Sequence, residues 1–81
     1  MQKTKAQQNG HNWSDGPYIE LDSKNNIIYW EDSTGYWEMW EHDELDREIY
    51  WEDSIGYWEK WEYHKRGYLY DNKKGKKKVA Q

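Results

Sequence analysis

Apolar and polar residues alternate along most of this chain in short runs, which are separated by Asp, Asn, Ser and Gly. A period of two places successive side chains on opposite faces of a β-strand. Turn residues recur about every 8–12 positions, a spacing typical of an antiparallel meander. The glycines interrupt every window before it reaches helical length. We predict strands at residues 18–21, 27–31, 36–42, 48–52, 57–63 and 68–70, with a seventh at 76–79.

A tandem repeat with an offset of 21 residues dominates the chain. Residues 28–41 read IYWEDSTGYWEMWE and residues 49–62 read IYWEDSIGYWEKWE. Such a period indicates one supersecondary unit used repeatedly, and rings flanking Asp-Ser-x-Gly favour a β-hairpin. Gly35, Gly56 and Gly67 suit the positive φ that these turns need, and Asp46 stands in the slot that matches Gly67 and tolerates it at some cost. The predicted fold is all-β, a single twisted antiparallel meander of six or seven strands built from tandem β-hairpin repeats.

Strict alternation assigns side chains to faces in both copies. In the long strands it separates Tyr36, Glu38 and Trp40 from Trp37, Met39 and Glu41, and the second copy follows the same order. In the short strands it places Ile28 opposite Tyr29, and Ile49 opposite Tyr50.

The composition shifts twice along the chain and divides it into three segments. Residues 1–12 are polar, and we expect a disordered arm there. Residues 13–72 carry the repeats and form the β-hairpin repeat domain. Residues 73–81 are a basic C-terminal tail or edge strand, in which Lys either contacts nucleic acid or an acidic membrane or discourages edge-to-edge aggregation. We favour the edge strand.

The apolar material is mainly aromatic, with seven Trp, eight Tyr and no Phe. Each ring buries roughly 150–250 Å² when packed, so a few close the modest core that this length allows. The absence of Cys excludes disulfide bonds, thiolate nucleophiles and Cys-based zinc sites. No apolar run follows the charged start of the chain, so we expect neither a signal peptide nor a membrane span, and a cytoplasmic location.

The net charge of −4 conceals an asymmetry. Residues 29–62 hold twelve acids against Arg47 and Lys60, a net charge of −10. Residues 65–81 are rich in Lys and Arg and contain one acid, Asp71. An acidic body repels nucleic acid and attracts basic surfaces.

The turn and ring positions resemble the YD repeat of RHS-type proteins over roughly residues 27–67. The matching positions are Gly35, Trp40, His42, Asp43, Arg47, Ile49, Asp53 and Gly56. In that family the repeats build β-hairpins that extend a sheet shell, so the resemblance implies hairpin architecture. Asp46 replaces the expected Gly, His64 replaces the expected Asp, and two repeats are too few for a large shell. Short proteins with such acidic aromatic repeats also resemble accessory proteins of phages or mobile elements.

Ten side chains of the two long strands are the candidate partner-binding residues. Trp and Tyr dominate many protein interfaces, and the interleaved carboxylates favour a basic partner. A ring ladder also stacks bases or sugars, but acids disfavour phosphate contacts. The candidates are Tyr36, Trp37, Glu38, Trp40, Glu41, Tyr57, Trp58, Glu59, Trp61 and Glu62.

Catalytic and metal-binding signals are weak. Glu38 and Glu59 recur between rings, where a desolvated carboxyl acts as a general acid, but charged residues on a half-wet sheet usually stay exposed or paired. His42 and His64 lack the convergent ligands that a metal requires. We expect no enzyme activity, no metal and no cofactor.

We therefore predict a non-enzymatic protein-binding module or inhibitor that docks on a basic surface of a host or cognate protein. In the specific form of this prediction the module mimics nucleic acid. It would then act, for example, as a phage anti-defence protein in the host cytoplasm. One alternative is carbohydrate or small-ligand binding through the strip of Trp37 and Trp58. A second alternative is a self-assembling structural repeat, and a homodimer is compatible with the sequence. Nucleic-acid or membrane partners are not expected.

Overall fold

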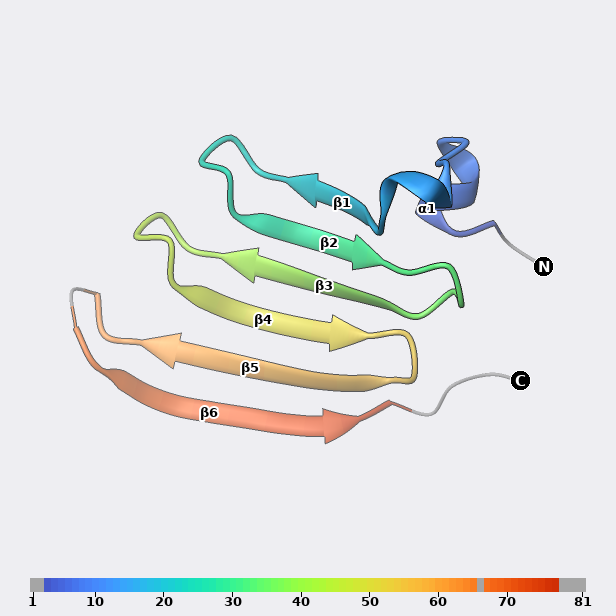
Figure 1. Cartoon of the computed structure of the whole chain (residues 1–81). Helices are drawn as coiled ribbons and strands as arrows, with labels where there is room; N and C mark the ends of the chain where they lie inside the picture. The colour runs from blue at the N-terminus through green and yellow to red at the C-terminus, as the bar shows by residue number, and fades with distance from the viewer. Residues whose placement is uncertain (1–2, 66, 78–81) are drawn as a thin grey trace.

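Six strands joined in chain order form one antiparallel sheet in the computed structural model, which describes residues 3–65 and 67–77 (Figure 1). The strands are β1 (Tyr18–Leu21), β2 (Ile27–Glu31), β3 (Trp37–His42), β4 (Glu48–Asp53), β5 (Tyr57–Tyr63) and β6 (Leu69–Lys76). A one-turn helix, α1 (Lys5–Gln8), and a 3-10 turn, η1 (Trp13–Asp15), precede β1. The predicted all-β meander is confirmed.

The sheet is a single layer, with overall extents of 41 × 32 × 16 Å. Its accessible surface is 6429 Å², whereas a globular monomer of about 10 kDa exposes roughly 5,300 Å². Few side chains are buried: within the described residues these are the hydrophobic Ala6 and Tyr29 and the charged Glu31 and Asp53. Most of both sheet faces is therefore available for contacts.

Tight turns connect the strands at the predicted positions. The Asp32 carboxylate accepts a hydrogen bond from the backbone N–H of Thr34 (2.9 Å), and Gly35 follows with a φ of 92°. Gly56 has a φ of 98° at the equivalent position of the second copy. Asp46 has a φ of 63°, in the left-handed region that costs a non-glycine residue some conformational energy. The positive φ values expected at Gly35, Gly56 and Asp46 are confirmed.

One residue in each 21-residue unit bulges out of the pairing register. The pairing of β1 with β2 passes over Ile28, that of β3 with β4 over Ile49, and that of β5 with β6 over Tyr70. A bulge sets two residues of one strand opposite one residue of its partner. Ile28 and Tyr29 accordingly line the same hollow, as do Ile49 and Tyr50. The expectation that these isoleucines lie opposite the tyrosines is wrong, because strict alternation takes no account of bulges.

A short helix stands within residues 3–12, a segment whose polar composition predicted an arm without regular structure. The Thr4 hydroxyl accepts a hydrogen bond from the Gln7 N–H, and the Gln7 side chain accepts one from the Thr4 N–H. Ala6 is fully buried, and its backbone N–H donates to Glu31 Oε1 (3.3 Å). The reciprocal bonds of this capping box explain why a polar segment forms a helical turn. Residues 1–2 lie outside the described residues.

The last strand is longer than predicted, and no separate strand begins at residue 76. β6 continues through the lysine-rich segment, where Lys74 pairs with Glu59 and Lys76 pairs with Tyr57 of β5. A lysine-rich segment is a poor strand former by itself, and its pairing with an acidic neighbour offsets this. Lysines also protect an open sheet edge. The remainder of the predicted tail, residues 78–81, lies outside the described residues.

Candidate functional site

The pairing register divides the ten candidate residues between two faces. We call the face with Trp30, Trp40, Trp51 and Trp61 the tryptophan face, and the opposite one, against which α1 packs, the helix-covered face. The tryptophan face holds the candidates Tyr36, Glu38, Trp40, Tyr57, Glu59 and Trp61. The helix-covered face holds Trp37, Glu41, Trp58 and Glu62. The ten candidate residues therefore do not form one site; they form two separate surfaces on opposite faces of the sheet.

Rings and carboxylates occupy neighbouring strands on the tryptophan face. Trp40 of β3 pairs directly with Trp51 of β4, and Trp51 pairs in turn with Glu59 of β5. On the other side Trp30 of β2 pairs with Glu38 of β3. All five side chains are half-buried. In the part of the chain that the structure describes, no second layer lies over this face (Figure 1).

The charges of two carboxylates on the tryptophan face act on a third, that of Glu48. Burial raises the pKa of Glu48 above its ordinary value of 4.5. The neighbouring His42 opposes this rise, and the negative charges of Glu59 and Glu38 each add a smaller increase. Glu38 and Glu59 are thus close enough to Glu48 to repel its charge in a partly desolvated setting. A cation brought to this face would relieve that repulsion.

Tyr36 holds one of these carboxylates in place. Its hydroxyl donates to Glu38 Oε1 (3.1 Å) and is also within 3.2 Å of Asp53 Oδ2. Burial and the two neighbouring acids raise the pKa of Tyr36, so the hydroxyl remains a donor. Asp53 is itself anchored, since it accepts backbone N–H bonds from Ile55 (3.1 Å) and Tyr57 (3.0 Å). The network fixes Glu38 relative to the turn between β4 and β5.

The two candidate tryptophans of the helix-covered face pack on the sheet itself. Trp37 stacks on Tyr29, with ring centroids 6.0 Å apart and an interplanar angle of 26°. Trp58 lies over Gly75, where an added Cβ would stand 3.0 Å from the indole ring. Both indoles are half-buried. Their packing explains why both copies carry Trp at this position.

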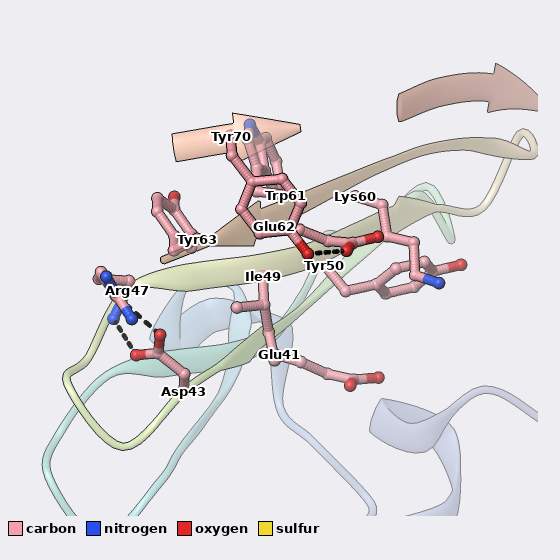
Figure 2. Close-up of a pocket in the computed structure, with 10 residues that line it drawn as sticks. All are labelled: Glu41, Asp43, Arg47, Ile49, Tyr50, Lys60, Trp61, Glu62, Tyr63 and Tyr70. Atoms are coloured by element: carbon pink, nitrogen blue, oxygen red, sulfur yellow. Dashed lines mark hydrogen bonds and ion pairs between the residues drawn. The ribbon is translucent and has the colours of Figure 1, made fainter. Parts of the chain in front are cut away.

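A shallow hollow of about 640 Å³ lies on the helix-covered face beside the second copy (Figure 2). At one end the Arg47 Nε donates to Asp43 Oδ2 (2.8 Å), and the guanidinium carbon lies 4.5 Å from the ring centroid of Tyr63. Above the floor the Tyr70 hydroxyl donates to Glu62 Oε2 (2.6 Å). The lining residues are Glu41, Asp43, Arg47, Ile49, Tyr50, Lys60, Trp61, Glu62, Tyr63 and Tyr70.

The candidate set omitted residues that the structure brings into the site. Trp30 belongs to β2, and Trp51 and Glu48 belong to β4; they join the tryptophan face through the pairing of β2, β3 and β4. The repetition of Trp30 as Trp51 in both copies is the sequence signal that points to them. Glu48 had no such signal, because its position depends on the bulge at Ile49.

Residues 3–65 and 67–77 contain neither a metal-binding cluster nor a membrane-spanning helix. Within these ranges no group of three His, Asp or Glu side chains is placed to hold a metal ion. No helix within them has the length and apolar character needed to cross a membrane. Glu38 and Glu59 stand on strands β3 and β5, with β4 between them.

Comparison with family models, with curated proteins and with solved structures found no match to this chain. The resemblance to YD repeats stays a prediction.

Proposed function

We propose that this chain is a non-enzymatic protein-binding module whose tryptophan face docks on a basic surface of a partner protein. The observation that carries the proposal is the placement of Glu38, Glu48 and Glu59 among half-buried indoles, on a face that no second layer covers within the described residues. Open faces of this kind usually mark interaction sites.

The chemistry of this face suits Lys and Arg side chains. Indoles supply large contact area and cation–π attraction. A carboxylate in a partly desolvated setting interacts more strongly with a cation than one in water. The raised pKa of Glu48 means that burial and nearby negative charges disfavour its ionised form in the unbound protein. An incoming cation would stabilise that form.

The specific form of the proposal is an inhibitor that mimics nucleic acid. Sheet carboxylates then stand in for phosphates on a nucleic-acid-binding host protein, and an anti-defence role for a phage protein in the host cytoplasm is the setting we propose. Such a module competes with nucleic acid for its partner. Added duplex DNA should then displace the module from its partner. If the module binds the partner outside the nucleic-acid site, the partner would hold the module and the DNA together.

The experiment that tests the proposal uses the two faces as matched surfaces. Tagged full-length protein is incubated with host lysate at low and at high salt, and bound proteins are identified by mass spectrometry. The double variant Glu38→Lys and Glu59→Lys should lose the partner, because it reverses charge on the tryptophan face. The matched control Glu41→Lys and Glu62→Lys reverses charge on the helix-covered face and should retain it. Equal capture by both variants would contradict the proposal.

A second candidate function is binding of a carbohydrate or small ligand. A hollow of about 450 Å³ is lined by Trp51, Tyr57, Trp58, Glu59, Lys74, Gly75 and Lys76, and it combines rings with polar groups as sugar sites do. A glycan array tests it: sugar binding that is lost in Trp51→Ala and kept in Trp37→Ala would favour this function.

A further inference from the structure

The helix-covered face carries two hollows that the 21-residue repeat relates to each other. Tyr29 and Met39 line the first hollow together with α1 residues, among them Lys5. Tyr50 and Lys60 stand at the equivalent positions of the second hollow. Within the described residues, no helix lines the second hollow. Helix α1 on the first hollow therefore indicates which chemical groups the second hollow can bind.

Helix α1 presents a cation and a backbone donor to the first copy. The Lys5 ammonium lies 4.7 Å from the ring centroid of Tyr29 and 3.2 Å from Glu20 Oε1. One residue later the Ala6 N–H donates to Glu31 Oε1. The lysine thus binds through a ring face and a carboxylate, which together hold an ammonium better than either does alone.

The second copy retains the groups that receive this lysine. Tyr50 corresponds to Tyr29, and its hydroxyl donates to Glu52 (2.7 Å) as that of Tyr29 donates to Glu31 (2.8 Å). Glu41 corresponds to Glu20 and is exposed. The described residues offer Glu41 no ion-pair partner within 4.0 Å.

Charge in the second hollow also favours a cation. Arg47 is neutralised by Asp43 at 2.8 Å, and the Lys77 ammonium, which lies beside the Tyr50 hydroxyl, is neutralised by Glu52 at 2.8 Å. The remaining charges are the carboxylates of Glu41 and Glu62 against the single ammonium of Lys60. A net negative hollow with aromatic walls suits a positively charged side chain.

We propose that the second hollow is a binding site for a lysine side chain of a partner protein, with the ammonium over the ring of Tyr50 and paired with Glu41. The contact reproduces the one that Lys5 makes on the first copy. It lies on the face opposite to the tryptophan face and does not depend on the function proposed for that face. A contact this small is weak, with a Kd of roughly 0.1–1 mM for an isolated peptide.

Lys60 lowers the affinity of this site for a lysine side chain. It replaces Met39 of the first copy and brings a like charge to the hollow that receives the lysine. Lys60→Met makes the second hollow resemble the first and removes the repulsion. Its expected effect is a roughly two- to fivefold tighter Kd for a lysine-bearing peptide.

The test titrates full-length protein with a capped peptide of the sequence of residues 3–10, KTKAQQNG, and follows backbone amide shifts by NMR. Shifts should centre on Tyr50 and Glu41 and weaken as salt increases. Glu41→Gln should reduce binding and Lys60→Met should strengthen it. Both positions are exposed, so neither change is expected to disturb the fold. The control peptide replaces both lysines, which correspond to Lys3 and Lys5, with Gln and should not bind.

Three results would overturn the proposal. One is the absence of any shift at millimolar peptide. A second is a set of shifts at Tyr29 and Trp37 instead, since the peptide would then only displace α1 from the first copy. A third is the same set of shifts at Tyr50 on raising the concentration of the protein alone, since a second copy would then be the occupant.

Discussion

At the residue scale, the acidic sheet is ordered by tyrosines that donate to carboxylates two positions along the same strand. The hydroxyl of Tyr18 lies 2.7 Å from Glu20 Oε2, and that of Tyr50 lies 2.7 Å from Glu52 Oε1. Residues i and i+2 share a face of a strand, so the Tyr-x-Glu spacing is a local device. It allows many carboxylates to sit in one sheet with fixed positions.

The pair of Tyr29 and Glu31 is the most buried of these, and Tyr29→Phe should be destabilising. Glu31 is 1 % exposed and accepts only from the Tyr29 hydroxyl and the Ala6 N–H within the described residues. Removing one donor from a buried carboxylate costs about 1–3 kcal/mol. Denaturant unfolding measures this loss.

The matched control is Tyr50→Phe in the second copy. Its carboxylate, Glu52, is less buried and keeps the Lys77 ammonium at 2.8 Å. The loss of unfolding free energy should stay below about 1 kcal/mol. Equal losses in the two variants would contradict the argument from burial.

Replacement of Glu48 by Gln should stabilise the protein at neutral pH. Burial and the charges of Glu59 and Glu38 raise the folded-state pKa of Glu48 above 4.5. Ionisation therefore costs stability as the pH rises from about 4.5 through the folded-state pKa. Thermal melts of both proteins should show a gain in the variant at pH 7 that shrinks toward pH 4. A gain of the same size at both values would exclude this cause.

At the element scale, the open edge strand β6 depends on a tryptophan that covers a glycine. Gly75→Ala would place a Cβ 3.0–3.2 Å from three indole atoms of Trp58, so the ring must move. We expect a loss of about 1–3 kcal/mol, which is typical of overpacking, together with a change in tryptophan fluorescence. In a Trp58→Leu background the same substitution should cost less. An unchanged cost in both backgrounds would show that the indole is not the obstacle.

The sequence predicted the elements better than the surfaces. The Asp-Ser-x-Gly turns locate the hairpins, because their chemistry is local. The bulges at Ile28 and Ile49 are not visible in an alternating pattern, so the faces of these residues were misassigned. Grouping of Trp51 with Trp40 also depends on strand register. The helix around Ala6 is stabilised by contact with Glu31, which lies 25 residues away in sequence.

At the scale of the whole molecule, the sheet is a row of units that contact only their neighbours. The described strands pair in chain order, and the bulges recur at a spacing of 21 residues. A single layer has no core that all strands share, so its stability is close to a sum of unit and interface terms. Removal of one whole unit should therefore shorten the sheet without unfolding it.

Deletion of residues 28–48 tests this, because it joins Ile27 to Ile49 and preserves the repeat, the bulge and the alternation of faces. The shorter chain should keep a β-sheet circular dichroism spectrum and unfold cooperatively, with a denaturant m-value lower by roughly a quarter, in proportion to its length. The control deletion of residues 28–38 removes half a unit and joins Ile27 to Met39. It should lose more β-sheet signal and more stability than the whole-unit deletion, since β1 and β3 run in the same direction and a tight turn connects only antiparallel strands, so β1 is left unpaired. If the whole-unit deletion fails to fold, the units depend on long-range contacts and the additive description is wrong.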